Sequence, residues 1–322
     1  MNNKRILITG INGFVGSHLA DLLAQKEEGM EIYGTIRGRT ANLENLKHLK
    51  QQIKIIECDI TDAYSVNKTI EEVEPDFVFH LAAQAFVPAS WRSPIETMNT
   101  NVIGSMNLFE ALRKSKTEAR IQIAGSSEEY GLVLQNETPI TEKNELRPLS
   151  PYGVSKCTMD LLGYQYFKSY GMKIVRTRAF NHTGPRRGDA YVCSNWCKQV
   201  AEINAGKQQP TIMVGNLEAK RDFTDVRDIV RGYALAAEKG KVGEVYNLCS
   251  GKTHVMKDIL EKIKMHAKKA VSVKEDPARL RPSDVMILLG DYSKFNKATG
   301  WKPEIPFDKT LEDLFAYWEQ RV

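Results

Sequence analysis

The chain has 322 residues, of which 42% are hydrophobic and 26% charged, and its formal net charge is +5. This length exceeds what one hydrophobic core usually supports, so the sequence predicts two joined lobes, and the ordinary composition excludes disordered, collagen-like and disulfide-stapled proteins. The apolar runs are too short to span a bilayer and the basic residues are dispersed, so we expect a cytoplasmic protein that binds neither membrane nor nucleic acid.

Strands and helices alternate along the first half of the chain. Segments rich in β-branched residues and bounded by glycine, proline or polar clusters predict strands at residues 5–9, 31–36, 53–57, 76–82, 119–124, 173–179 and 244–248. Helical apolar spacing predicts helices at residues 17–24, 66–73, 93–113 and 152–168. This alternation indicates the α/β class, with a Rossmann-type, doubly wound parallel sheet that has helices on both faces.

The second half of the chain differs in pattern. From about residue 180 the alternation weakens, and proline, tryptophan and arginine become more frequent. We therefore expect residues 1–180 to form the nucleotide-binding domain, with a return at about 222–250. Residues 181–221 and 251–322 are expected to form a smaller α/β substrate-binding lobe. A parallel sheet binds its ligand beyond the carboxyl ends of its strands, where the strand order reverses.

A glycine-rich segment follows the first predicted strand and opens the first helix. Its glycines are spaced G-x-x-G-x-x-G rather than in the usual G-x-G-x-x-G dinucleotide pattern. Glycine permits positive φ and lets the backbone approach a pyrophosphate, whose charge meets free N–H groups at the helix N-terminus. Glycines also serve ordinary turns, but this position favours a dinucleotide site. The expected contacts are Gly10, Asn12, Gly13, Phe14, Val15 and Gly16.

The end of the second strand bears on which dinucleotide binds. An acidic residue there would bind the ribose 2′-hydroxyl of NAD, whereas arginine suits the 2′-phosphate of NADP. After this strand the chain carries Arg37 and Arg39, and no carboxylate follows them before Glu44. This favours NADPH, with NADH use and a merely solvated basic loop as the alternatives.

Asp59 and Ile60 follow the third predicted strand and are placed to meet the adenine. The alternative role for Asp59 is to cap the next helix. Thr61 or Asp62 could equally supply that cap, so the pattern leaves both roles open.

Tyr152 and Lys156 stand four residues apart at the start of a predicted helix, so both side chains project from one face. An ammonium beside a phenol stabilises the phenolate and is expected to lower the pKa of Tyr152, making it a proton donor and acceptor. The segment 125–131, GSSEEYG, follows the fifth strand at the same sheet edge. There the Ser126 hydroxyl can share a substrate oxygen with Tyr152. Tyrosine and lysine at this spacing are common on helices by chance. The glycine loop, Ser126 and this pair occur in that order along the chain, and together they favour a catalytic role.

The cysteines do not suggest a metal site. They form an odd set without a C-x-x-C pair: Cys58, Cys157, Cys193, Cys197 and Cys249. Cys193 and Cys197 could share a helix face, but without a second ligand pair nearby, buried apolar thiols are favoured over zinc. We expect no metal.

The glycine loop, Ser126, Tyr152, Lys156 and the segment 80–84 (HLAAQ) together resemble the extended short-chain dehydrogenase/reductase family, whose members act on nucleotide sugars. The resemblance runs from residue 4 to about residue 301. It implies that Ser126, Tyr152 and Lys156 form a catalytic triad, with Lys156 also holding the nicotinamide ribose. It further implies a cofactor lining made by Leu81, Ala82, Ala83 and Gln84.

Later segments resemble the branch of that family that handles GDP-mannose derivatives: residues 181–188, 214–223, 281–285 and 289–291. The resemblance implies a GDP-sugar substrate whose diphosphate is held by Asn181, Arg221, Arg279 and Arg281. Planar bidentate donors suit a diphosphate, although each arginine alone could form a surface ion pair. Ser126, Ser127 and Glu128 are the expected contacts to the sugar.

That branch contains a GDP-mannose 4,6-dehydratase and a reductase that converts GDP-4-dehydro-6-deoxy-D-mannose to GDP-D-rhamnose. Glu128 stands where the dehydratase carries its base, and residues 186–187 also resemble it. Ser126 in place of its usual threonine, the segments 181–185 and 221–228, and the shorter chain resemble the reductase. We expect the NADPH-dependent reductase, with the dehydratase and a non-catalytic NADP-sensing protein as alternatives.

The family resemblance also implies a homodimer formed through the helices at residues 93–113 and 152–168. The second of these carries aromatic residues that would suit a buried interface, although core packing explains them almost as well. They are Tyr164, Tyr166, Phe167 and Tyr170.

Overall fold

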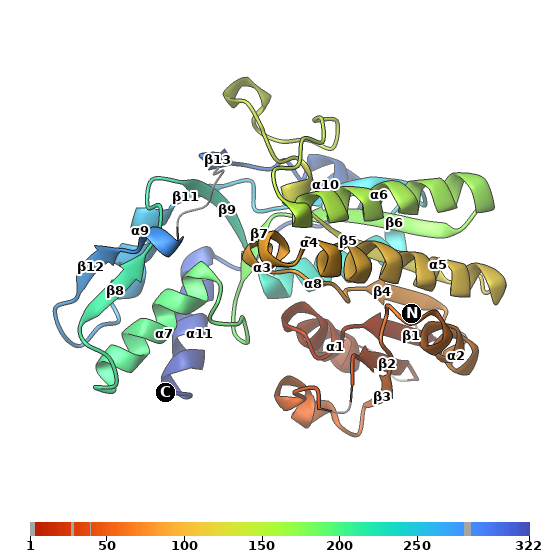
Figure 1. The fold of residues 1–322 in the computed structure, drawn as a ribbon, viewed down its shortest axis with the longest axis horizontal. Coiled ribbons are helices and arrows are strands. Elements are labelled where there is room, and N and C mark those ends of the chain that lie inside the picture. The colour runs from red at the N-terminus through yellow and green to blue at the C-terminus, as the bar shows by residue number, and fades with distance from the viewer. Residues whose placement is uncertain (1–3, 27–28, 39, 280–284) are drawn as a thin grey trace.

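The computed structural model describes residues 4–26, 29–38, 40–279 and 285–322 (Figure 1). Two sequence predictions, for Arg39 and Arg281, lie outside the described residues. In the part of the chain that is described, no helix combines the length and the apolar character needed to cross a membrane.

A parallel sheet of seven strands forms the larger part of the molecule, in the order β10-β6-β5-β4-β1-β2-β3. Its strands are β1 (Arg5–Thr9), β2 (Glu31–Ile36), β3 (Ile53–Glu57), β4 (Phe77–His80), β5 (Arg120–Ser126), β6 (Lys173–Ala179) and β10 (Val245–Leu248). The predicted Rossmann-type sheet is confirmed, with every strand of the prediction present. The strand order reverses between β1 and β4, which places the expected ligand crevice at their carboxyl ends.

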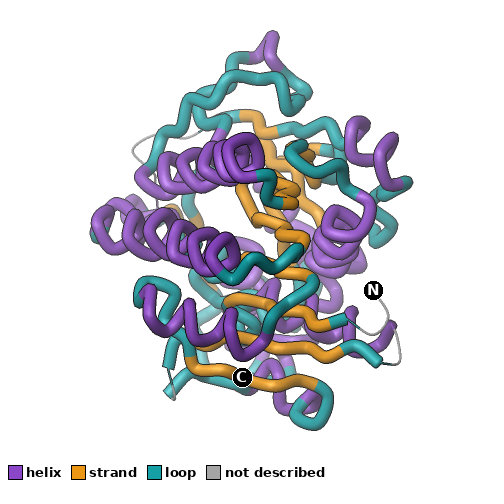
Figure 2. Tube along the Cα trace, turned by 90° about the vertical axis from the view of Figure 1, so that its right-hand side faces the viewer, coloured by secondary structure: helices purple, strands orange, loops and turns teal. Residues whose placement is uncertain are grey.

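Helices cover both faces of this sheet, as Figure 2 shows. The helices on one face are α1 (Phe14–Lys26) and α8 (Val226–Lys239), and those on the other are α2 (Ala63–Val73), α5 (Gly104–Lys114) and α6 (Pro151–Tyr170). Along β1, Ile6 and Ile8 join the first core and Leu7 joins the second, because successive side chains of a strand point to opposite faces. The sequence analysis assigned no helix at α8.

The helix predicted at residues 93–113 is interrupted. The structure has α3 (Val87–Arg92), α4 (Pro94–Met98), a π-helical turn η2 (Asn99–Ile103) and then α5. Within the turn, the buried Asn101 donates hydrogen bonds to the Gln84 carbonyl at 3.1 Å and to Ser155 Oγ at 2.9 Å. These contacts hold the turn against Gln84 and α6, and π-helical turns are frequent at functional sites.

A smaller lobe contains two further sheets and lies to the left in Figure 1. Its strands are β7 (Asn181–Thr183), β8 (Thr211–Val214), β9 (Lys220–Asp225), β11 (Thr253–Val255), β12 (Ser272–Glu275) and β13 (Ile287–Leu288). Strand β9 pairs with β7, β11 and β13, and β8 pairs with β12. The helices around their core are α7 (Val192–Asn204), α9 (Met256–Lys264) and α11 (Phe307–Glu319).

The chain passes between the two lobes more than once. Strand β9 hydrogen-bonds within the smaller lobe, and the chain rejoins the large sheet at α8. Phe295 of α10 (Ser293–Thr299) and Trp301 pack into the core of the large sheet, although residues 251–322 were expected in the smaller lobe. Trp301 Nε1 also donates to the Asp228 carbonyl of α8 at 3.0 Å. This contact ties the late segment to the larger core.

Short 3₁₀ turns complete the described structure: η1 (Glu44–Leu49), η3 (Ser127–Glu129), η4 (Gln135–Glu137) and η5 (Pro277–Arg279). Turn η3 directly follows β5 at the carboxyl edge of the large sheet. It therefore carries Ser127 and Glu128, two of the side chains that the sequence placed near the reaction centre.

Candidate active site

The glycine loop makes a tight turn between β1 and α1. Gly10 has φ of 70°, and a Cβ there would lie 3.0 Å from the Ala82 Cα. A Cβ on Gly16 would lie 2.5 Å from the Gly10 carbonyl oxygen, and Gly13 N–H donates to that oxygen at 3.1 Å. The loop thus leaves backbone open toward a ligand at the N-terminus of α1, which fits the pyrophosphate of a dinucleotide.

The segment after β4 lies beside this loop. Leu81 N–H and Ala82 N–H both donate to Thr9 Oγ1 at 3.0 Å, so the end of β1 holds the end of β4. Gln84 N–H donates to Asn101 Oδ1 at 2.8 Å, and the Gln84 side-chain amide donates to Thr97 on α4. The structure therefore brings the predicted residues 81–84 next to the glycine loop.

Arg37 lies at the exit of β2 with a largely exposed side chain. Its Nε lies 3.3 Å from Asp59 Oδ2, and its Nη1 lies 3.7 Å from Glu96 Oε1 on α4. Asp62 rather than Asp59 caps α2, because it accepts from the backbone N–H groups of residues 64 and 65. Asp59 instead accepts from Thr61 N–H at 2.9 Å. A 2′-phosphate at Arg37 would therefore compete with two carboxylates.

The structure brings the three predicted catalytic side chains together. Ser126 ends β5, and Tyr152 and Lys156 lie in the first turns of α6, which Ser150 caps. The Tyr152 hydroxyl is hydrogen-bonded to the Ser126 side chain. Lys156 Nζ lies 5.9 Å from the Tyr152 ring centroid and donates to the Ala124 carbonyl at 2.8 Å.

Burial sets the proton affinities of this group. It raises the pKa of Tyr152 above its ordinary value, the Ser126 hydrogen bond opposes this, and the charge of Glu128 adds to the rise. The expectation that Lys156 lowers this pKa was wrong, because the cost of burying a phenolate dominates. Burial also lowers the pKa of Lys156 to about 8, and Glu129 partly offsets that shift. At neutral pH Tyr152 therefore carries its proton.

Arg187 is a site residue to which the sequence analysis gave no role. Its guanidinium carbon lies 3.4 Å from the Tyr191 ring centroid and 4.7 Å from the Phe14 ring centroid, and its charge interacts with Tyr152. Its Nε is buried and has no hydrogen-bond acceptor within the described residues. His182 stacks on Phe14 with 6.1 Å between ring centroids. The sequence does not show that the segment carrying His182 and Arg187 packs against Phe14 of the glycine loop; the structure does.

The predicted substrate residues lie in different environments. Asn181 begins β7 between the lobes, and its buried Nδ2 has no acceptor among the described residues, which fits a polar ligand. Arg221 Nη1 donates to the Lys220 carbonyl at 3.0 Å, and Arg279 Nη1 donates to Asn195 Oδ1 at 2.8 Å. Ser127 is buried in η3. These residues stay predicted contacts.

The cysteines are buried and free: Cys58, Cys157, Cys193, Cys197 and Cys249. Cys193 and Cys197 face the core of the smaller lobe from α7, and burial raises the pKa of Cys193 to about 12. Within the described ranges, no three histidine, cysteine or acidic side chains gather as metal ligands would.

Comparisons with known proteins agree with this geometry. A family model described as GDP-mannose 4,6 dehydratase matches residues 7–314. The GDP-6-deoxy-D-mannose reductase of Pseudomonas aeruginosa is 31% identical, over 99% of this chain and 98% of its own length. GDP-mannose 4,6 dehydratase 1 of Arabidopsis thaliana is also 31% identical, over 96% and 88%.

A solved structure described as RMD from Pseudomonas aeruginosa complexed with NADPH superposes with a TM-score of 0.87 at 30% identity. It covers 99% of this chain and all of that one. The shared fold is that of NAD(P)-dependent enzymes that act on sugar nucleotides. The chain belongs to the GDP-mannose 4,6-dehydratase family of extended short-chain dehydrogenases/reductases.

Proposed function

We propose that this enzyme reduces the 4-keto group of GDP-4-dehydro-6-deoxy-D-mannose with NADPH and forms GDP-D-rhamnose. The observation that carries the proposal is the buried Tyr152 hydroxyl, hydrogen-bonded to Ser126 and raised in pKa, beside the Lys156 ammonium. A ketone reduction ends with an alkoxide that needs a proton, and a protonated phenol can donate it. The similarity to a reductase over nearly the full length of both chains supports the same reaction.

In this mechanism the three side chains act on the ketone oxygen. NADPH, when bound, supplies the hydride to C4. Ser126 and Tyr152 hold the carbonyl oxygen by hydrogen bonds, and Tyr152 gives it a proton as negative charge develops there. Lys156 offsets the charge that remains on the phenolate until solvent returns a proton.

Residues at the edge of the large sheet would hold the cofactor. The backbone of Gly10, Gly13 and Gly16 would face the pyrophosphate, and residues 81–84 would line the nicotinamide half. Arg37 would hold the 2′-phosphate in place of its present partners, Asp59 and Glu96. Because those carboxylates oppose a phosphate, we expect a preference for NADPH without exclusion of NADH.

A dehydratase is the second candidate, and Glu128 favours it. Its charge acts on the Tyr152 phenol, so a carboxylate lies near the triad where a second acid/base would have to work. Several relatives carry that name, among them the Arabidopsis thaliana protein. In the reductase, Glu128 would instead accept a hydrogen bond from a substrate hydroxyl.

Two assays on the same preparation separate these candidates. NADPH absorbance is followed with the 4-keto sugar nucleotide, and the mass of GDP-mannose is measured after incubation without added reductant. The reductase predicts stoichiometric loss of NADPH and unchanged GDP-mannose. Loss of water from GDP-mannose, with NADPH unconsumed, would assign the lyase instead.

A further inference from the structure

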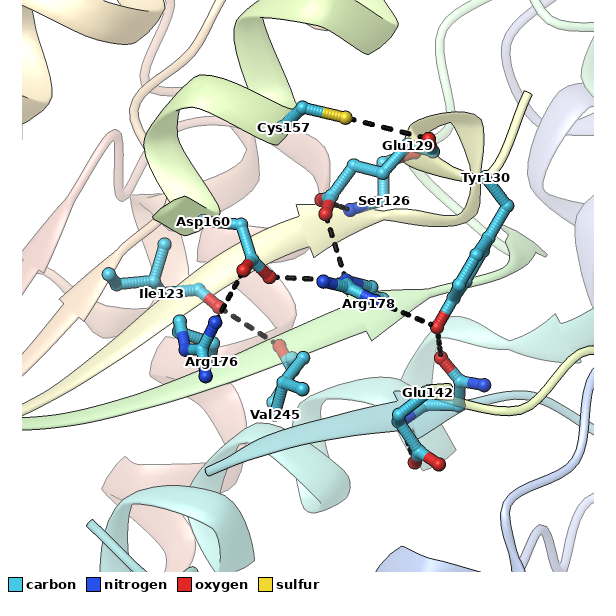
Figure 3. A network of polar contacts seen from close by, with 12 residues as sticks. Ile123, Ser126, Glu129, Tyr130, Glu142, Cys157, Asp160, Arg176, Arg178 and Val245 are labelled. Atoms are coloured by element: carbon cyan, nitrogen blue, oxygen red, sulfur yellow. Dashed lines mark hydrogen bonds and ion pairs between the residues drawn. The ribbon is translucent and has the colours of Figure 1, made fainter. Parts of the chain in front are cut away.

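A network of buried charges lies beneath Ser126, and the mechanism above does not use it (Figure 3). Its carboxylates are Glu129 and Asp160, and its guanidiniums are Arg176 and Arg178; at most 9% of any of these side chains is exposed. Burying four charges costs more than a hydrophobic core of the same volume would. The network therefore calls for a role other than stability.

Glu129 connects this network to the reaction centre. Its Oε1 accepts from Ser126 N–H at 2.7 Å, while Ser126 Oγ accepts from Glu128 N–H at 3.2 Å. The two bonds close the turn η3 on itself and fix the backbone that carries the Ser126 hydroxyl. Gly125 leaves the space, because a Cβ there would lie 2.4 Å from Glu129 Oε1.

The far side of the carboxylate is held by charges from β6 and α6. Arg178 Nε lies 2.9 Å from Glu129 Oε2 and donates to Asp160 Oδ2 at 3.1 Å. Arg176 Nη1 reaches Asp160 Oδ1 at 2.6 Å. Asp160 lies one helical turn beyond Lys156 on α6, so the same network is attached to the helix that carries the catalytic lysine.

The groups that face Glu129 come from β5, β6, α6 and the end of η3. They are Ser126 N–H from β5, Tyr130 after η3, Lys156, Cys157 and Asp160 from α6, and Arg178 from β6. Burial lowers the pKa of Lys156, and the charge of Glu129 raises it. Burial and Asp160 raise the pKa of Glu129 itself, against the charge of Arg178.

We propose that Glu129 is a positioning residue for catalysis: its side chain, held in place by Arg178, accepts from the Ser126 backbone N–H and so fixes where the Ser126 hydroxyl lies. The proposal rests on the role assigned above to Ser126. Glu129 acts on the reaction only through that residue.

The test compares Glu129→Gln with Asp160→Asn. Glutamine keeps an oxygen for Ser126 N–H but brings no negative charge and turns an amide toward Arg178. Asp160→Asn removes a charge from the same network without touching Ser126. The amide that faces Arg178 weakens the anchor of the turn that carries Ser126. We expect Glu129→Gln to lower kcat about tenfold at neutral pH with KM nearly unchanged, because substrate still binds but the Ser126 hydroxyl is misplaced.

Asp160→Asn should lower kcat by less than about threefold, because the bond from Ser126 N–H to Glu129 remains. Equal losses of kcat in the two variants, or an unchanged kcat in Glu129→Gln, would reduce the network to a structural one. Glu129→Asp, which keeps a carboxylate but shortens the side chain, should also lower kcat with KM nearly unchanged. It replaces the glutamine variant if that variant fails to fold.

NADPH affinity separates a misplaced Ser126 from a damaged fold, because cofactor binding needs no turnover. Measured by quenching of protein fluorescence, the affinity of Glu129→Gln should match that of the wild type, and a loss of affinity parallel to the loss of kcat would overturn the positioning role. A wild-type enzyme inactive on the 4-keto sugar nucleotide would refute the reductase instead. The same comparison of kcat in the dehydration of GDP-mannose would then test Glu129.

Discussion

At the scale of single residues, Tyr152 is the side chain on which the chemistry depends. Replacing it by phenylalanine removes the proton donor and leaves the ring and its packing in place. We expect turnover to fall by about 10²–10⁴, with NADPH affinity changed less than about threefold, as measured by NADPH absorbance and by titration. Tyr166→Phe, on the same helix but buried in the core, is the control and should retain turnover. Unreduced turnover in Tyr152→Phe would remove it from its role.

Burial of the Lys156 ammonium lowers the stability of the folded protein. Its pKa is lowered to about 8 in the folded protein against 10.5 for the free side chain, so folding is penalised fully below pH 8. The penalty disappears as pH rises through 10.5. Lys156→Met should therefore abolish turnover yet raise the free energy of unfolding at pH 7, by about 3 kcal/mol at most. Urea unfolding at pH 7 and pH 10 checks this, because most of the gain must be lost at the higher pH.

Arg37 tests the cofactor assignment. An aspartate at this position, beside Asp59 and Glu96, would add a third carboxylate where the 2′-phosphate is expected. Arg37→Asp should weaken NADPH binding at least about tenfold and NADH binding much less. The dissociation constants of NADPH and NADH, measured for the wild type and for Arg37→Asp, test this assignment. Equal losses for the two would place the 2′-phosphate elsewhere.

At the scale of elements, the junction of β1 and α1 leaves no room for a side chain at Gly16. A Cβ at Gly16 would meet backbone atoms of residues 10 and 11 at 2.5 and 2.8 Å, and backbone cannot yield as a side-chain end can. Gly16→Ala should cost about 2 kcal/mol of stability and lower NADPH affinity. Gly188→Ala, where a Cβ meets nothing within 4 Å, is the matched control. Thermal unfolding with and without NADPH measures both; a neutral Gly16→Ala would contradict the close packing.

Helix α6 also joins the site to the surface. Its inner face carries Tyr152 and Lys156, whereas Leu161 and Tyr164 are exposed on its outer face, and Tyr166 is buried in the core. The aromatic residues that the sequence could not assign are thus divided between core and surface. The helical period places these residues on different faces of α6. The structure shows which of those faces is buried.

At the scale of the whole molecule, exposed apolar side chains gather on helices α4 and α6. Ile95 is 77% exposed and Leu161 57%, and such a surface is typical of an interface. We expect a homodimer through these helices. Leu161→Arg should give monomers in sedimentation velocity without unfolding, whereas Met265→Arg, on the smaller lobe and 78% exposed, should not. A wild-type monomer would refute the dimer.

The sequence by itself determined the features that depend on near neighbours. Strands β1, β2, β3 and β6 have the predicted bounds, because apolar alternation and turn residues act locally. The glycine loop and the spacing of Tyr152 and Lys156 predicted where the site lies for the same reason. The smaller lobe was less predictable, since β9 pairs with strands from distant parts of the chain.

Only the tertiary structure decided the proton affinities and the partners of the site. Tyr152 has a raised pKa because folding removes it from water, which outweighs the opposing hydrogen bond with Ser126. The charges beside Glu129 come from β6 and α6, and Arg187 lies against Phe14 although the two are far apart in the chain. Burial and long-range charge contacts arise when distant segments meet, and a short sequence pattern contains no record of that meeting.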